Sequence, residues 1–71
     1  MIRLRVREIA EARGFNQSTL SRASDVSFNT IKRIFQNPYR SVSTDTLDRL
    51  AKALGVDIRD LVESVPDDER R

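Results

Sequence analysis

The segment QSTLSRASDVSFNTIKRIFQ, residues 17–36, decides the fold. It contains two short stretches of helical periodicity, separated by residues 24–26. Aspartate tolerates a left-handed backbone better than most residues, so Asp25 can end one helix and let the chain turn sharply. The second stretch places three apolar side chains on one face: Ile31, Ile34 and Phe35. We therefore predict two short helices joined by a tight corner.

The opposite face of the second stretch is polar and carries Asn29, Lys32, Arg33 and Gln36. Asparagine can pair with adenine and arginine with guanine through two hydrogen bonds, each pair worth about 1–3 kcal/mol of discrimination. Asn29 and Arg33 are four residues apart, so one lies above the other on the helix. This predicts a half-site with an A·T and a G·C pair close together. The alternative is a solvated helix face, and the preceding corner favours DNA.

Helical spacing also predicts a first helix over about residues 5–13, ended by Gly14. The first four or five residues could be extended instead, because Ile2, Leu4 and Val6 alternate with arginines. The second helix begins near residue 16 or 17, with Asn16 as its N-cap, and ends near Ala23. We expect Leu20 and Ala23 to form its inward face.

The third helix is predicted to start after the cap Ser27 and to end at residues 37–38, because the residue before proline avoids helical angles. A fourth follows the cap Ser43 and closes at Gly55. Asp57 caps a short fifth helix whose apolar residues belong to the core, or alternatively extend into a dimer interface: Ile58, Leu61 and Val62.

The length of 71 residues predicts one domain, residues 1–65, followed by a charged flexible tail, residues 66–71. Residues 1–43 hold eight basic and three acidic side chains, whereas residues 44–71 hold five and eight. The basic half would face a polyanion such as DNA. The chain lacks cysteine and histidine and has no apolar run near the roughly 20 residues of a membrane span. We expect a cytoplasmic protein without a membrane contact, metal or cofactor.

Catalysis is not expected from this sequence. Without histidine or cysteine, no serine or threonine has an identifiable base to activate it. The two glycines, Gly14 and Gly55, form no phosphate-cradling loop. We therefore assign no catalytic residue and predict that the protein is not an enzyme.

The runs GFNQSTLSRASDVSFNTIKRI and TLDRLAKALGVDIRDL, residues 14–34 and 46–61, resemble the helix-turn-helix domain of the lambda repressor and Cro type, also called the XRE family. The resemblance covers about residues 3–63. It implies an all-α fold, a compact domain of five helices around one core, with a short extended N-terminal arm as the alternative for the first residues.

The resemblance also implies which residues contact DNA. Gln17 would meet a phosphate with its amide and side chain, at a helix N-terminus that suits anions. The third helix would reach bases or the adjacent backbone, and the following loop would track phosphates. These positions are Gln17, Ser27, Phe28, Asn29, Lys32, Arg33, Gln36 and Arg40.

Three positions depart from the family pattern. Asp25 replaces the usual glycine of the corner and brings a negative charge. Phe35 stands where the family commonly has glutamate, so it adds to the core or lies under the loop. Phe28 replaces an often polar residue, and it either packs on a thymine methyl or shields the first turn of its helix.

These features predict a sequence-specific regulator of transcription that binds double-stranded DNA as a homodimer on a pseudo-palindromic site. A repressor would insert the helix of residues 27–37 into the major groove and exclude polymerase. The alternative is an antitoxin-like or adaptor module with a protein partner, such as a toxin or polymerase. The N-terminal arginines are surface charges, or else part of an arm along phosphates or a partner's strand: Arg3, Arg5 and Arg7.

Overall fold

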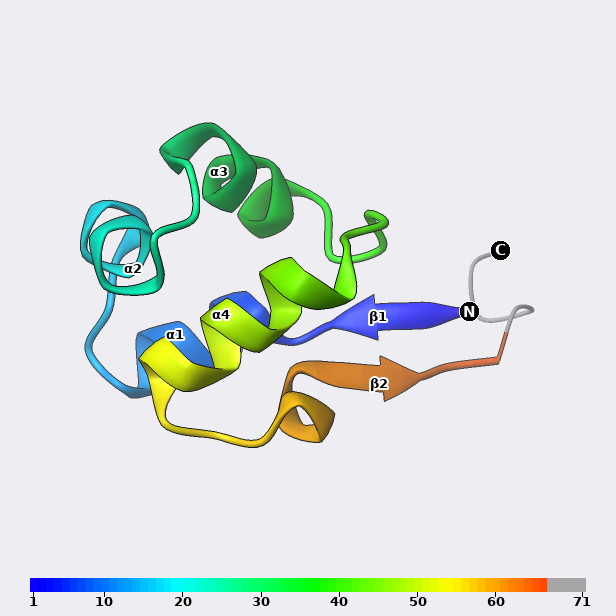
Figure 1. The fold of residues 1–71 in the computed structure, drawn as a ribbon. Coiled ribbons are helices and arrows are strands. Elements are labelled where there is room, and N and C mark those ends of the chain that lie inside the picture. The colour runs from blue at the N-terminus through cyan, green and yellow to red at the C-terminus, as the bar shows by residue number, and fades with distance from the viewer. Residues whose placement is uncertain (67–71) are drawn as a thin grey trace.

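Helices pack around one core beside a small sheet in the computed structural model, which describes residues 1–66 (Figure 1). The predicted tail, residues 66–71, lies outside the described residues except for Pro66. The elements in chain order are β1 (Ile2–Leu4), α1 (Val6–Ala12), α2 (Gln17–Ser24), α3 (Phe28–Gln36), α4 (Thr44–Leu54), the 3-10 helix η1 (Ile58–Leu61) and β2 (Val62–Ser64).

The predicted caps begin α2, α3 and α4. The Asn16 side chain accepts a hydrogen bond from the amide of Thr19 at 2.9 Å, and the Thr19 hydroxyl accepts one from the Asn16 amide at 2.9 Å. Ser27 accepts from the amide three residues later at 3.2 Å, and Ser43 does the same at 3.2 Å. Each cap pairs an amide that the helix leaves without a partner, which explains why local sequence determines these starts.

The core lies between α2, α3 and α4, with α1 and η1 closing it. Leu20, Ile31 and Leu50 are fully buried at its centre. The expected inward position of Ala23 is wrong, because Ala23 is exposed and Ser24 is buried in its place. Leu20 and Ser24 are four residues apart, so they share the face of α2 that packs on the core. Ser24 tolerates burial because its hydroxyl donates a hydrogen bond to the Leu20 carbonyl at 2.6 Å.

The five-helix, all-α expectation is wrong in its last element. Residues 58–61 form a single 3-10 turn, and the chain then enters β2, which pairs antiparallel with β1. Leu4 lies opposite Val62, so β1 and β2 place apolar side chains on the core side. The extended alternative for the N-terminus is thereby confirmed. Sequence periodicity could not settle this because each strand needs the other, 58–62 residues away along the chain, to satisfy its backbone.

Ion pairs cover the solvent side of the sheet. Arg3 contacts Glu63 at 2.8 Å and Glu8 at 2.6 Å, and these two carboxylates raise the pKa of Arg3 above its ordinary value. At the start of η1, the amide of Arg59 donates to Asp57 at 2.9 Å and lowers the pKa of that carboxyl. The two ion pairs of Arg3 link β2 to β1 and α1, on the side of the molecule away from α3 (Figure 1), whereas the Asp57–Arg59 contact is local to η1.

Candidate nucleic-acid interface

α2, the corner and α3 form the helix-turn-helix unit that the sequence predicted. Asp25 ends α2 with a φ of 57° and a ψ of 33°, the left-handed conformation, and α3 starts three residues later. Among residues 1–66, Asp25 is the one residue other than glycine with a positive φ. The corner brings α3 against α2, and α3 lies at the top of the molecule in Figure 1.

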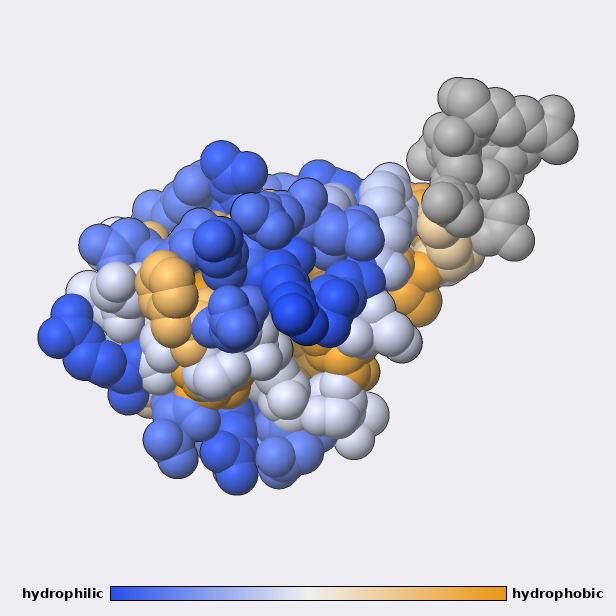
Figure 2. Space-filling view, turned by 90° about the horizontal axis from the view of Figure 1, so that it is seen from above, coloured by the Kyte–Doolittle hydropathy of each residue, from blue (hydrophilic) through white to orange (hydrophobic). Residues whose placement is uncertain are grey.

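The inward face of α3 is buried as predicted, and it holds the helix in place. Ile31 is fully buried, Ile34 is 2 % exposed and Phe35 is 9 % exposed. The position of Phe35 settles its role, because the ring belongs to the core. The opposite face is thus left free, and Figure 2, seen from above, shows mainly hydrophilic side chains there with a few apolar patches.

The structure brings most of the predicted DNA-contacting residues to this free face. Four polar side chains of α3 are exposed: Asn29, Lys32, Arg33 and Gln36. Phe28 is 47 % exposed in the first turn of the same helix, and Arg40 is exposed in the loop after it. The exposure of Phe28 is compatible with both of its predicted roles, packing on a thymine methyl and shielding the first turn of the helix. The side chains therefore project as the recognition chemistry requires.

The cations of this face have no carboxylate partner. Within residues 1–66, Lys32, Arg33 and Arg40 form no ion pair, and neither do Arg13 and Arg22. Six other cations do: Arg3, Arg5, Arg7, Arg49, Lys52 and Arg59. Residues 26–44 contain no acidic residue at all. An incoming phosphate would meet these three cations without displacing an internal partner.

Gln17 lies at the other end of the unit, at the N-terminus of α2, where it is half-buried. It lines a hollow with Gln36 at the end of α3, so the packing brings these two glutamines together. The amides of Gln17 and Ser18 donate no hydrogen bond within the described residues. Free amides at a helix N-terminus suit a phosphate oxygen.

Ser27 is placed differently from the other candidates. Its hydroxyl accepts from the Thr30 amide at 3.2 Å and donates to the Thr30 hydroxyl at 2.8 Å. The Ser27 hydroxyl hydrogen is therefore already used inside the protein. The contribution that Ser27 makes in this structure is to start α3, and any contact with DNA would use its backbone or its remaining acceptor capacity.

Two residues near this surface escaped the sequence reasoning. Arg7 was interpreted as a surface charge or part of an arm, yet it lines the hollow of Gln17 and Gln36 while pairing with Glu11 at 3.3 Å. Arg49 of α4 contacts Asp25 in the corner. Only the spacing of Arg7 and Glu11, four residues apart, was visible beforehand. The packing of α1 and α4 on the helix-turn-helix unit supplies the rest.

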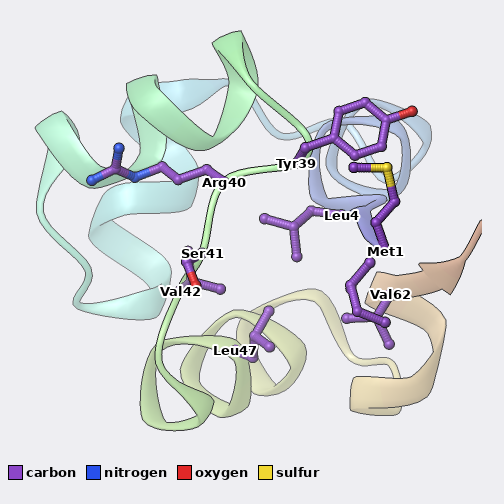
Figure 3. A pocket seen from close by; sticks show the side chains of 9 residues that line it. Met1, Leu4, Tyr39, Arg40, Ser41, Val42, Leu47 and Val62 are labelled. Carbon is purple, nitrogen blue, oxygen red and sulfur yellow. The ribbon is translucent and has the colours of Figure 1, made fainter. Parts of the chain in front are cut away.

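A second hollow, lined largely by apolar side chains, lies beside the loop after α3 (Figure 3). β1 contributes Ile2 and the buried Leu4, and the loop contributes Tyr39. The other lining residues are Met1, Arg40, Ser41, Val42, Leu47 and Val62. Ile2 is 54 % exposed and Tyr39 is 43 % exposed. Figure 3 shows that the Arg40 guanidinium extends away from the other lining side chains. We call this surface, residues 1, 2, 4, 39, 42, 47 and 62, the apolar groove.

Other kinds of site find no support among residues 1–66. No cluster of three or more potential ligand residues is placed to hold a metal ion. No helix there is long and apolar enough to cross a membrane.

Comparison with known proteins agrees with this geometry. A family model described as the Cro/C1-type HTH DNA-binding domain matches residues 5–67, which include α1 to β2 and the whole helix-turn-helix unit. A search of curated proteins found no match. The predicted resemblance is thus confirmed over nearly the whole chain. With its corner, its outward α3 and this match, the chain belongs to the Cro/C1-type helix-turn-helix DNA-binding family.

Proposed function

We propose that this protein is a sequence-specific transcriptional regulator, acting as a repressor, that inserts α3 into the major groove of double-stranded DNA. The observation that carries the proposal is the outward face of α3, where the amides of Asn29 and Gln36 are exposed and neither Lys32 nor Arg33 has an ion-pair partner within residues 1–66. A repressor needs only to occupy a promoter and exclude polymerase. This function requires no catalysis and no cofactor, and it places the protein in the cytoplasm with its DNA.

The residues divide between base reading and phosphate binding. Asn29 and Arg33, one turn apart on the exposed face, read an adenine and a guanine. Phe28 packs on a thymine methyl beside them. The phosphate-binding positions set the register of the unit on the duplex: Gln17 at the start of α2, the backbone of Ser27 at the start of α3, Lys32 and Gln36 on α3, and Arg40 in the following loop.

A homodimer follows from the size of the domain, because one small module buries too little DNA surface for tight specific binding. The apolar groove supports this step. Ile2 and Tyr39 are two of the three exposed large apolar residues among residues 1–66, and the third, Phe28, lies on α3. The groove adjoins the loop that carries Arg40. A second copy bound there would cover Ile2 and Tyr39 and extend the DNA-binding surface across the two-fold axis.

Selection of bound sequences from a pool of random duplexes tests the proposal. We expect a palindromic consensus whose half-site contains an A·T and a G·C pair close together. Arg33→Ala should weaken binding to that site by roughly 5- to 150-fold, the equivalent of about 1–3 kcal/mol, and relax the preference for the G·C pair. Binding to random duplexes should weaken far less.

The matched control is Arg59→Ala, which removes an arginine that is 86 % exposed on η1, away from α3. This variant should bind the selected site like the wild type. Failure to enrich any sequence, or equal losses for the two arginine variants, would contradict the proposed role of α3.

The apolar groove also favours a second candidate function, a module that binds another protein, such as a toxin or polymerase. In that case the chain would co-purify with a protein through Ile2 and Tyr39, and its affinity for duplex DNA would be weak at all salt concentrations. A steep loss of DNA affinity with rising salt distinguishes the first candidate from this one.

A further inference from the structure

Asp25 is an unexpected charge in the DNA-facing part of this protein. Residues 12–44, which hold the whole helix-turn-helix unit, contain five cations and this single carboxylate. The Asp25 side chain is 98 % exposed, and it lies two residues before Ser27 at the start of α3. A carboxylate here repels phosphate and weakens DNA binding unless it is neutralised.

Arg49 of α4 reaches this carboxylate from outside the helix-turn-helix unit. Its Nη1 donates to the backbone carbonyl of Asp25 at 3.2 Å and lies 3.6 Å from the Asp25 carboxylate. Its Nε pairs with Asp45, one turn earlier on α4, at 3.2 Å. The guanidinium is therefore oriented by one aspartate of its own helix while it contacts both the charge and the backbone of the left-handed corner residue.

We infer that Arg49 is a positioning residue for DNA recognition, which neutralises Asp25 and holds the corner so that no uncompensated negative charge lies beside the exposed face of α3. This inference rests on the proposed DNA-binding function. It assigns a role in DNA affinity to a residue of α4 that need not touch DNA. In this inference, the negative charge of Asp25 is compatible with DNA binding because Arg49 pairs with it.

Both parts of this role have measurable consequences. Without Arg49, the Asp25 charge is left beside the phosphates, and the resulting repulsion weakens as salt screens it. A merely stabilising Arg49 would instead change the fraction of folded protein and leave the affinity of the folded protein unchanged. The Asp25→Asn variant distinguishes charge neutralisation from stabilisation of the fold, because asparagine also tolerates the left-handed conformation but carries no charge.

The experiment measures affinity for the selected DNA site, per folded molecule, at several salt concentrations. Wild type is compared with Arg49→Ala, Asp25→Asn and the double variant, and urea unfolding gives the folded fraction of each. Lys52→Ala is the matched control, because Lys52 also lies on α4 and pairs with an aspartate four residues away, Asp48, at 3.0 Å. Arg49→Lys keeps the charge and serves if Arg49→Ala does not fold.

We expect Arg49→Ala to weaken binding about three- to fivefold near 0.1 M salt, with a smaller loss at higher salt. Asp25→Asn should bind at least as tightly as wild type, and adding Arg49→Ala to it should cost no more than Lys52→Ala costs the wild type. Arg49→Lys should remain within about twofold of wild type.

Equal losses for Arg49→Ala with and without Asp25→Asn would overturn the inference, as would a loss no larger than that of Lys52→Ala. If Arg49→Ala does not fold, Arg49→Lys is used instead. A loss of DNA affinity of more than tenfold in Arg49→Lys that is not restored by adding Asp25→Asn would also overturn the inference. Wild type that shows no salt-dependent binding to duplex DNA would instead refute the proposed function itself.

Discussion

Arg40 offers the sharpest test of how the protein meets the phosphate backbone. The residue is exposed, its guanidinium extends away from the apolar side chains of the groove, and within residues 1–66 no carboxylate pairs with it. Its amide donates to the Asn37 carbonyl at 3.2 Å, which gives the loop after α3 a defined turn. Arg40→Ala therefore removes one cation from the proposed interface and leaves the backbone contact in place.

The magnitude follows from counterion release. Each phosphate that a cation neutralises adds about 0.9 to the slope of log affinity against log salt, so a roughly fourfold rise in salt costs about 3.5-fold in affinity per contact. Arg40→Ala should lower the slope by about 0.9 for each protomer, or about 1.8 for a dimer. Sequence preference should stay the same, because a phosphate contact carries no base information.

Fluorescence anisotropy with the selected site and with a random duplex, between about 50 and about 200 mM salt, measures both slopes. Arg59→Ala is again the control, because it removes the same charge from the side of the molecule opposite α3. An unchanged slope for Arg40→Ala, or an equal change for Arg59→Ala, would refute the reasoning. A changed base preference would instead mean that Arg40 reads sequence.

Two further predictions concern stability and assembly. Ile31→Ala, at a fully buried position of α3, should lower the free energy of unfolding in urea by about 2–5 kcal/mol, and a loss below about 1 kcal/mol would mean that α3 is not anchored by this face. Tyr39→Lys, at the rim of the apolar groove, should shift sedimentation from dimer toward monomer without changing the helical circular dichroism. A dimer that survives this change does not use the groove.

Local chemistry made much of the fold predictable. Asn16, Ser27 and Ser43 cap their helices as expected, because a side-chain oxygen three residues before an orphan amide needs no distant partner. Asp25 and Gly55 adopt the left-handed conformation at the helix ends where the sequence placed turns. The periodicity of α3 likewise determined its buried face, and hence which side chains remain exposed.

The interface was predictable to the same extent as α3 was. The outward positions of Asn29, Lys32 and Arg33 follow from the burial of Ile31 and Ile34 on the other side of one helix. The sequence predicted Ser27 both as the cap of the third helix and as a DNA contact. The structure shows the Ser27 hydroxyl hydrogen-bonded to Thr30, as the cap requires. Whether each of these residues touches DNA remains a prediction that the selection experiment and the substitutions test.

By itself the sequence determined the helix starts, the corner and the polar face of α3, since these depend on residues within about one or two turns of each other. Tertiary structure decided that residues 62–64 become a strand, that Arg7 reaches the hollow of Gln17 and Gln36, and that Arg49 contacts Asp25. Each of these requires segments far apart in the chain to meet. Their partners are chosen by the packing of one shared core, which local periodicity does not specify.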